Sequence, residues 1–521
     1  MAEPLRVSIV ATEYSPLAKD SGRADIIAAI AQGAAQRGHA VSVFLPAYRD
    51  LVVPDGAKRE TAVAAFDVPM GTESGSPVEP ASLIHVTLPH VPLEILLVHH
   101  RGDRRFFDRS GLVRDRALGN PHADNAERFA FFGRAVLEAH RALERRTDLV
   151  HLFDARTSWV AGYLKRTLAE DPFFVRTGCL LSVLDWSDQA PEPVTAIRAL
   201  GLAADADDPW ARFKGESTMP ILKVGLRHAD LIALPSTRFA EELREDRALA
   251  GPLGTVLATR VKDLTGVVPG IDTRSWDPAR DPALPQRYSV NDPAAKTASR
   301  MALAERAGWP SDPAQAGWER PIVGLVASLK DEKGLDLVKQ TSQAMLGLDM
   351  RFFVVGVGDP AYHMLFEVLA RRFPEHVHAR LRFDDALVRQ VVAGADLLLV
   401  PSRYEAGGRH QLRALRYGTP PIVHATGGLF ETVKDFDASA LTGTGFTFTP
   451  YDPEALIGAL KRALETYQRP HAWERIVKQA MSEDWSWAKT AAGYEQAYRE
   501  VRRRVEAKRF SAWALGVARS S

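Results

Sequence analysis

Three features that many protein classes depend on are scarce or absent in this sequence. It has one cysteine, Cys179, among 521 residues, which excludes an intrachain disulfide and a cysteine-rich metal site. No run of 18 or more apolar residues occurs, so we expect no membrane span. Basic and acidic residues nearly balance, 66 against 65, so the net charge gives no reason to expect binding to nucleic acid or to an anionic membrane.

The remaining composition is that of an ordinary globular protein. Hydrophobic residues make up 46% and charged residues 25% of the chain, and its length allows two or three domains with full cores. The amino terminus has an acidic residue near its start and only a short apolar run, which predicts a strand rather than a signal peptide. We therefore expect a cytoplasmic protein.

The strongest functional signal lies in residues 401–429, PSRYEAGGRHQLRALRYGTPPIVHATGGL. The apolar run 397–400 just before it predicts a buried parallel strand. Glu405 and the pair Gly407 and Gly408 follow, ahead of a helix-forming segment. A glycine loop at a helix start leaves backbone N–H groups exposed to a ligand, which suits a diphosphate, although a lone glycine pair is more often a simple turn.

A second unit of the same kind follows directly. Residues 419–423 predict another buried strand, and residues 425–429 predict a second glycine turn that opens a second helix. Near the amino terminus, strands at 7–10 and 41–45 flank a helix at 26–36, which forms a βαβ unit. Consecutive units of this kind create a nucleotide-binding crevice at the carboxyl ends of parallel strands.

The residue order in this region resembles a known family. The pattern Ser-Arg-aromatic-Glu-x-x-Gly-x-x-Gln, then Leu-Arg-Tyr-Gly-Thr-x-Pro-Ile-Val, then Ala-Thr-Gly-Gly-Leu is similar to the carboxyl-terminal signature of bacterial glycogen synthases and plant starch synthases. These are retaining glycosyltransferases. The resemblance implies an α/β fold of the GT-B architecture, with two facing Rossmann-like domains and a deep interdomain cleft.

The resemblance also implies a division of the chain. We expect an amino-terminal Rossmann-like domain on the acceptor side over residues 1–277 and a connector over 278–318, which is rich in proline, aspartate and alanine. A carboxyl-terminal glycosyltransferase domain on the nucleotide-sugar side should span 319–483. Residues 484–521 should form a helix that crosses back to the first domain.

The function implied by the resemblance is transfer of glucose from ADP-glucose to the non-reducing end of an α-1,4-glucan. No cofactor or metal is expected, the partners are a nucleotide sugar and an α-glucan, and the nucleotide base, acceptor length and oligomeric state stay open. The catalytic residues carried over from the family are Glu405, Lys333 and Asp154. The donor-binding residues are Lys19, Gly22, Asp25, Lys333, Gly408, Arg409, His410, Thr426 and Gly427.

Several positions depart from the family pattern, and three of these departures bear most directly on the site. The expected histidine, asparagine and arginine are Leu184, Pro269 and Ser328. Lys330 is the nearest substitute for the arginine. An ammonium group is a compact charge, however, whereas a planar guanidinium can donate two parallel hydrogen bonds to one phosphate. Arg409 and His410 are two other sources of phosphate-binding donors.

Two functional classes therefore stay open. The retained Glu405 and Lys333 favour an active synthase, or a relative with an altered donor or acceptor. The departures at Leu184 and Ser328 favour a non-catalytic paralogue that binds glucan or nucleotide sugar in a regulatory role.

Overall fold

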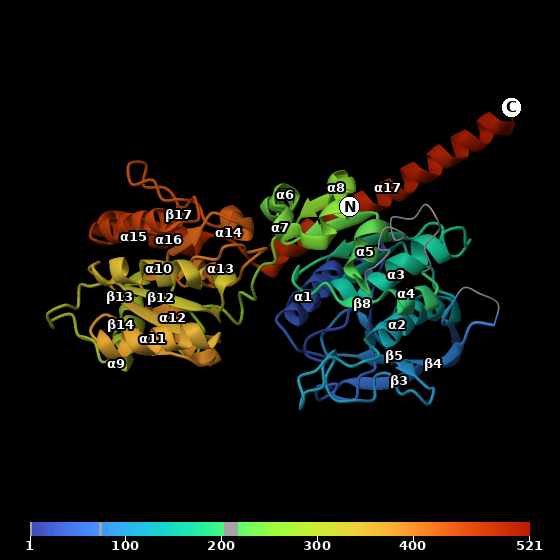
Figure 1. The fold of residues 1–521 in the computed structure, drawn as a ribbon, viewed down its shortest axis with the longest axis horizontal. Coiled ribbons are helices and arrows are strands. Elements are labelled where there is room, and N and C mark those ends of the chain that lie inside the picture. Colours follow the sequence, from blue (N-terminus) through green and yellow to red (C-terminus); the bar gives the residue numbers. More distant parts are fainter. Residues whose placement is uncertain (1–2, 72–74, 203–216, 521) are drawn as a thin grey trace. The chain divides into compact units, whose positions relative to one another are not determined.

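The computed structural model describes residues 3–71, 75–202 and 217–520 of the chain (Figure 1). The chain divides into two compact α/β units. Unit 1 consists of Met1–Leu234, Ala240–Val267 and Thr490–Ser521, and unit 2 consists of Pro235–Phe239 and Val268–Lys489.

Unit 1 is built on a nine-stranded sheet in the order β11-β10-β7-β6-β1-β2-β5-β4-β3. All neighbouring strands are parallel except the pairs β3–β4 and β4–β5. A separate antiparallel pair consists of β8 (Pro191–Pro193) and β9 (Thr218–Pro220). The strands of the large sheet are β1 (Arg6–Val10), β2 (Ala40–Pro46), β3 (Lys58–Pro69), β4 (Val78–Thr87), β5 (Glu94–His100), β6 (Leu149–Phe153), β7 (Gly178–Ser182), β10 (Leu231–Leu234) and β11 (Leu264–Gly266).

The helices of unit 1 include α1, which connects β1 to β2, and the long carboxyl-terminal helix α17, whose residues from Thr490 onward belong to this unit. Helix α6 begins in the short segment assigned to unit 2. The α-helices are α1 (Arg23–Gln36), α2 (Asn125–Ala142), α3 (Ser158–Gly162), α4 (Val194–Ala199), α5 (Leu222–His228), α6 (Thr237–Glu245), α7 (Arg247–Ala250), α8 (Gly254–Thr259) and α17 (Trp487–Ser520).

Helix α17 is held against the sheet of unit 1 by a buried polar contact as well as by apolar packing. Tyr498 is 1% exposed, and its hydroxyl forms a 2.9 Å hydrogen bond with Nδ1 of the fully buried His151. Burial lowers the pKa of His151 to about 3, so the ring is neutral. Nε2 of the same ring lies 2.7 Å from the Ser182 hydroxyl, which satisfies the second nitrogen of a side chain that would otherwise be costly to bury.

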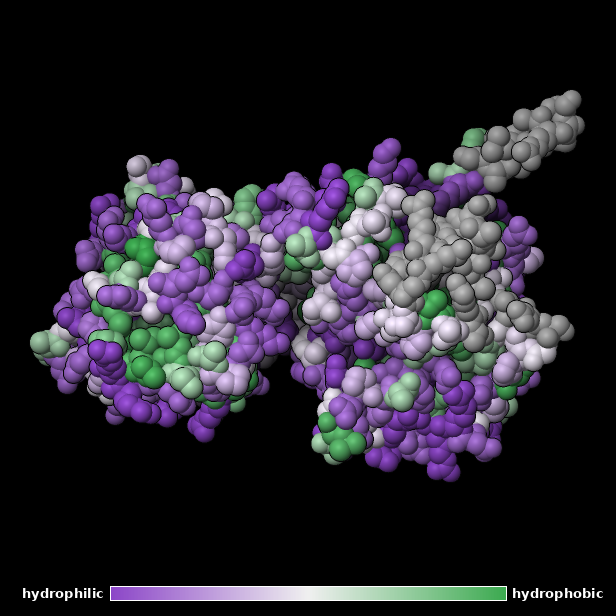
Figure 2. Space-filling model, in the orientation of Figure 1, coloured by the Kyte–Doolittle hydropathy of each residue, from purple (hydrophilic) through white to green (hydrophobic). Residues whose placement is uncertain are grey.

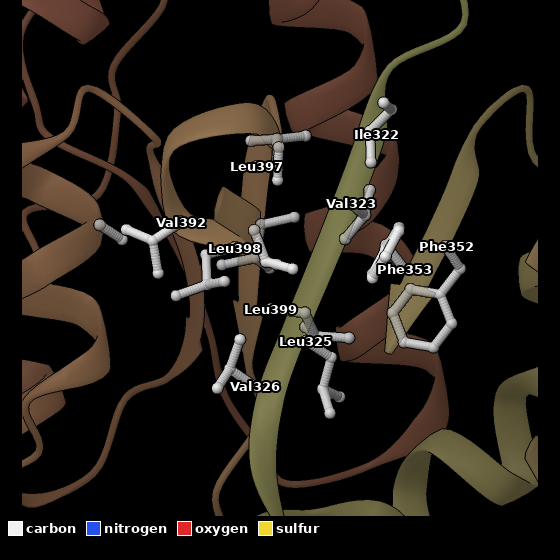
Figure 3. Packing of buried hydrophobic residues seen from close by; sticks show 14 of the residues in the cluster. Ile322, Val323, Leu325, Val326, Phe352, Phe353, Val392, Leu397, Leu398 and Leu399 are labelled. Atoms are coloured by element: carbon white, nitrogen blue, oxygen red, sulfur yellow. The ribbon is translucent and has the colours of Figure 1, made fainter. Parts of the chain in front are cut away.

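Unit 2 is built on a six-stranded, fully parallel sheet in the order β14-β13-β12-β15-β16-β17. Aliphatic and aromatic side chains of β12, β13 and β15 pack together in its core (Figure 3). Such continuous apolar runs are typical of strands buried on both faces. The strands are β12 (Ile322–Leu329), β13 (Arg351–Gly358), β14 (Val377–Arg380), β15 (Leu397–Val400), β16 (Pro421–His424) and β17 (Phe446–Phe448).

The α-helices of unit 2 alternate with its strands until β17, after which two helices follow in succession. They are α9 (Thr297–Ala307), α10 (Leu335–Leu346), α11 (Pro360–Arg372), α12 (Asp385–Gly394), α13 (His410–Arg416), α14 (Gly427–Thr432), α15 (Pro453–Tyr467) and α16 (Pro470–Ser482).

Most of the strands and helices expected from the sequence are confirmed with small shifts at their ends. The strand predicted at 397–400 coincides with β15, and the strand predicted at 419–423 begins two residues later, at Pro421. Before the strand begins, the Thr419 hydroxyl donates a hydrogen bond to the Val392 carbonyl, and the chain enters the sheet only after this residue. Segment 278–318, expected to be a connector, belongs to unit 2 and contains helix α9.

The face of the molecule in Figure 2 is mainly hydrophilic, with a hydrophobic patch on unit 2 where Figure 1 places α11 and α12. On α11, Met364 is 67% and Val368 is 50% exposed. No helix in the part of the chain that the structure describes combines the length and apolarity needed to cross a bilayer.

Two mid-helix glycines should respond in opposite ways to alanine. A Cβ at Gly33 in α1 would lie 2.4 Å from Cβ of Ala491 in α17. At Gly458 in α15, by contrast, no atom of the described residues lies within 4 Å of an added Cβ. Alanine at an open helical position stabilises by about 0.5–1 kcal/mol, and overpacking costs about 1–3 kcal/mol. Chemical denaturation should therefore show Gly458→Ala more stable, and Gly33→Ala less stable, than the wild type. An equally stabilised Gly33→Ala would contradict the close packing of α17 on α1.

Candidate functional site

Each large sheet has a point where its strand order reverses. In unit 1, β1 lies between β2 and β6, and in unit 2, β12 lies between β13 and β15. Connections on the two sides of such a point run in opposite directions, which opens a crevice at the carboxyl ends of the strands. The predicted site residues follow these strands: Lys19, Gly22 and Asp25 come after β1, Asp154 after β6, Lys333 after β12, and Glu405, Gly408, Arg409 and His410 after β15.

In unit 2, the two predicted catalytic side chains contact each other directly. Nζ of Lys333 lies 2.8 Å from Oε2 of Glu405, and the Ser402 hydroxyl donates to the same oxygen at 3.0 Å. The side chains of Lys333 and Glu405 are 27% and 17% exposed. The pair is therefore partly desolvated, and its attraction is stronger than that of a fully exposed pair.

Close backbone packing fixes the loops that carry this pair. Gly334 has φ +79°, and a Cβ there would lie 2.0 Å from the Pro401 carbonyl oxygen. Gly427 has φ +44°, and a Cβ there would lie 2.0 Å from the Glu405 carbonyl oxygen. The next amide, that of Gly428, donates to the Glu405 carbonyl at 2.9 Å. Both positions thus require glycine, for its conformation and for its lack of a side chain.

The start of α13 lies next to this ion pair. Gly408 has φ +71°, Arg409 is the N-cap residue, and the helix begins at His410. Burial, followed by the positive charge of Arg413, lowers the pKa of the His410 ring to about 3. Its buried Nδ1 has no hydrogen-bond partner among the described residues. The neutral ring therefore carries an unsatisfied nitrogen, which is costly unless a ligand or solvent molecule satisfies it.

Thr426 and Gly427 open the neighbouring helix α14, with Thr426 as its N-cap residue in an extended conformation. In unit 2, the structure therefore brings together Lys333, Glu405 and the two glycine turns. It also places a supporting network that sequence reasoning missed. Asp336 accepts from the Tyr451 hydroxyl at 2.6 Å and pairs with Arg403, whose guanidinium lies 4.6 Å from the centre of the Tyr451 ring. These residues are too far apart in sequence to form a recognisable motif.

Two of the three departures from the family pattern also lie in unit 2. Pro269 packs against Gly407. A Cβ added to that glycine would lie only 3.1 Å from Cδ of Pro269. Ser328 pairs with Val357 near the end of β12. Lys330 is exposed. Besides burial, the positive charges of Arg413, Arg409 and Lys333 lower the His410 pKa. Among the predicted phosphate-binding cations, Arg409 and Lys333 therefore act on the start of α13.

In unit 1, Lys19 and Asp25 form an ion pair in the loop after β1. Nζ of Lys19 lies 2.8 Å from both carboxylate oxygens of Asp25, and the lysine side chain is 51% exposed. Gly22 is the N-cap residue of α1. The exposed pair contributes little to stability, so a ligand can exchange for either partner at low cost.

A second charged group in unit 1 surrounds Arg23, which is not among the predicted site residues. Its Nη2 lies 2.9 Å from Oε1 of Glu13, and its Nη1 lies 3.6 Å from a carboxylate oxygen of each of three aspartates, Asp154, Asp185 and Asp188. Burial by itself would lower the pKa of Arg23, but the attraction of Asp154 and the other carboxylates raises it above its usual value.

Asp154 holds the chain at the third departure from the family pattern. Its Oδ1 accepts from the backbone amides of Leu184 at 2.7 Å and Asp185 at 3.1 Å. Asp154 itself has φ +61°, an uncommon conformation for a residue other than glycine. Burial raises the pKa of the Asp154 carboxyl to about 6, against the opposing charge of Arg23. No group of three or more metal-ligating side chains occurs in the residues that the structure describes.

Comparison with known proteins gives matches over both units. Residues 6–258 match the family model of the starch synthase catalytic domain, and residues 311–480 match that of glycosyl transferases group 1. Glycogen synthases of Anaeromyxobacter dehalogenans strain 2CP-1 and Anaeromyxobacter sp. strain K are 36% and 37% identical over 508 residues, which cover 95% of this chain and 99% and 100% of theirs. The catalytic domain of starch synthase IV from Arabidopsis thaliana, bound to ADP and acarbose, superposes with a TM-score of 0.78 at 26% identity and covers 96% of this chain and 100% of its own.

Arg23→Met should strongly destabilise unit 1, because it leaves Glu13 and the three aspartates without their shared cation. Removing one partner of a buried ion pair costs about 3–5 kcal/mol, and the 24% exposure of the Arg23 side chain places the expected loss at about 3 kcal/mol. Arg503→Met, which removes a 69% exposed partner of Glu500, is the matched control and should change the stability little, because exposed ion pairs contribute little. Equal losses in denaturant melts would contradict the central role of Arg23.

The destabilisation of Arg23→Met should also shrink as the pH falls. Burial raises the folded-state pKa of the Asp154 carboxyl to about 6, well above its ordinary value. A group whose pKa is raised by folding stabilises the folded state fully at pH values below its unfolded-state pKa. This stabilisation is lost as the pH rises through the folded-state pKa. Without Arg23 the carboxylates repel each other more, so the stability difference between variant and wild type should be smaller at pH 5 than at pH 8.

Proposed function

Because this chain belongs to the glycogen and starch synthase family of glycosyltransferases, we propose that it transfers glucose from ADP-glucose to the non-reducing end of an α-1,4-glucan with retention. The observation that carries this proposal is the Lys333–Glu405 pair at the strand-order reversal of unit 2. A cation and a carboxylate held together at that edge match the two charges that glucosyl transfer develops. The cytoplasmic location stays a prediction from the sequence.

The departing diphosphate needs positive charge and N–H donors, since negative charge grows on it as the glycosidic bond breaks. We assign this role to Lys333, Arg409 and the backbone around Gly408, with Thr426 and Gly427 at the second glycine turn. His410 is half-buried and its lowered pKa keeps the ring neutral, so it acts as a hydrogen-bonding group rather than a charge. In unit 1, we assign Lys19, Gly22 and Asp25 to the donor and Asp154 to holding the segment at Leu184 in place.

We assign Glu405 to the positive charge that develops on the sugar. Positive charge develops on the sugar ring as the bond to phosphate breaks, so a fixed carboxylate stabilises the transition state more than the bound substrate. In the structure, Lys333 neutralises this carboxylate. A bound diphosphate would compete for the ammonium group, which leaves the Glu405 carboxylate available to the sugar.

Glu405→Gln should lower the rate of glucose transfer by about 10²- to 10³-fold with little change in ADP affinity or thermal stability. The amide has the same size and still bonds to Ser402, but it carries no charge. Incorporation of labelled glucose into glycogen from ADP-glucose, with UDP-glucose in parallel, measures the effect and identifies the donor. Glu332→Gln, a change to an exposed carboxylate in the loop after β12, is the control and should leave the rate unchanged.

An active wild type whose rate survives Glu405→Gln would refute the role of Glu405. If wild type and variant are equally inactive with both donors, the protein is the non-catalytic paralogue that the departures at Leu184 and Ser328 allow.

Lys333→Ala should weaken ADP binding by about tenfold or more, because it removes a charge-assisted bond to the diphosphate. Lys330→Ala, three residues earlier and exposed, should change the affinity by less than about twofold. Isothermal titration calorimetry with ADP distinguishes the two lysines. Stronger loss in Lys330→Ala would show that Lys330 replaces the arginine expected at Ser328, contrary to our assignment.

A further inference from the structure

Unit 2 contains a large cavity at the edge of its sheet opposite to Lys333 and Glu405. The cavity has a volume of about 1240 Å³. Its lining includes Asp349, Pro321, Asp396 and Gly418, which precede β13, β12, β15 and β16. These positions mark the amino ends of the strands, whereas Lys333 and Glu405 follow the carboxyl ends. The cavity is therefore distinct from the candidate active site.

Two tryptophans in its lining are held in fixed orientations. The Arg300 guanidinium lies 3.8 Å from the centre of the Trp318 ring and donates to the Trp318 carbonyl at 2.6 Å. Arg300 is itself held by Asp396 at 2.9 Å. Trp473 packs edge-on against Tyr467, with ring centres 4.9 Å apart. Since their partners already restrain them, these rings would lose little conformational freedom when a ligand binds.

The charges of the lining disfavour an anionic ligand. Six lining residues are acidic and four are basic. Among the acidic residues, Asp396, Glu474 and Asp349 are paired with Arg300, Lys478 and Arg320, and basic lining residues are engaged within the protein as well. Arg300 pairs with Asp396, and Lys296 donates to the Thr419 hydroxyl at 2.7 Å. Burial also lowers the pKa of Lys296 to about 7. A phosphate or nucleotide would therefore meet a net negative surface.

The lining suits a neutral polyhydroxylated chain. The C–H face of a pyranose ring packs against an indole, and its hydroxyl groups bond to planar amides and carboxylates, such as those of Asn291, Gln468 and Glu465 in the lining. The volume exceeds that of a typical pocket for a drug-sized molecule, about 300–1,000 Å³, and so has room for several sugar rings.

We propose that this cavity binds a segment of α-glucan and tethers the polymer to the enzyme away from the reaction centre. The choice of glucan rests on the proposed function. A second attachment point raises the effective concentration of chain ends at the active site. The benefit exists only for a polymer long enough to reach both places, and a short oligosaccharide gains nothing.

The test is retardation of the protein in native gels that contain glycogen. Trp473→Ala should weaken glycogen binding by about fivefold or more, as expected for truncation of an aromatic side chain that contacts the ligand. The double variant Glu465→Ala/Gln468→Ala changes two exposed residues of the lining and should weaken it too, so the result stands if Trp473→Ala fails to fold. Phe383→Ala, at a 49% exposed aromatic residue outside the lining, is the control and should migrate like the wild type.

Kinetics separates this site from the active site. Trp473→Ala should raise KM for glycogen while kcat, KM for maltotriose and ADP affinity stay at wild-type values. If the wild type transfers no glucose, the proposed function fails, yet the gel assay still decides the cavity. Retardation of both cavity variants equal to that of the wild type would overturn the proposal. A loss of ADP affinity in Trp473→Ala would assign the cavity to a nucleotide and overturn it equally.

Discussion

Close approach of backbones is the constraint on which the candidate site in unit 2 depends. Added Cβ atoms at Gly334 and Gly427 would each lie 2.0 Å from a carbonyl oxygen, and one at Gly428 would lie 2.2 Å from the Gly407 oxygen. Three loops from different strands are thus in contact without side chains between them. Because protein interiors resist small displacements, the Lys333–Glu405 pair is held by the fold and not by the flexible side chains alone.

Unit 1 organises its corresponding edge in a different way. There the central feature is electrostatic, with Arg23 among four carboxylates. The Asp154 carboxyl, rather than a glycine contact, fixes the backbone at Leu184 and Asp185. Such an arrangement depends on pH and on the cations Arg23 and Arg156, the second of which pairs with Asp188 at 2.5 Å, whereas the steric arrangement of unit 2 depends on neither. The backbone at the Leu184 departure is therefore held through its amide group, which does not depend on the side chain at that position.

The two edges of the unit 2 sheet have different chemistry for a physical reason. At the carboxyl edge, Lys333, Arg409 and helix starts supply positive charge and N–H donors, which suits an anionic group. At the amino edge, the turn between α15 and α16 brings Tyr467 and Trp473 beside an excess of acidic residues, which suits a neutral ligand. The two edges thus suit different kinds of ligand, a charged group at one and a neutral chain at the other.

The sequence by itself determined the strands, the glycine turns and the family, because apolar runs and positive-φ glycines are local signals. It also placed Lys333 and Glu405 at the ends of strands. Only the tertiary structure decided that these two meet at 2.8 Å, that Arg23 gathers carboxylates from three loops, and that Trp318 and Trp473 line one cavity. These contacts join residues far apart in the chain, and their geometry follows from strand order and helix packing. No local pattern encodes that order, so no reading of neighbouring residues reveals it.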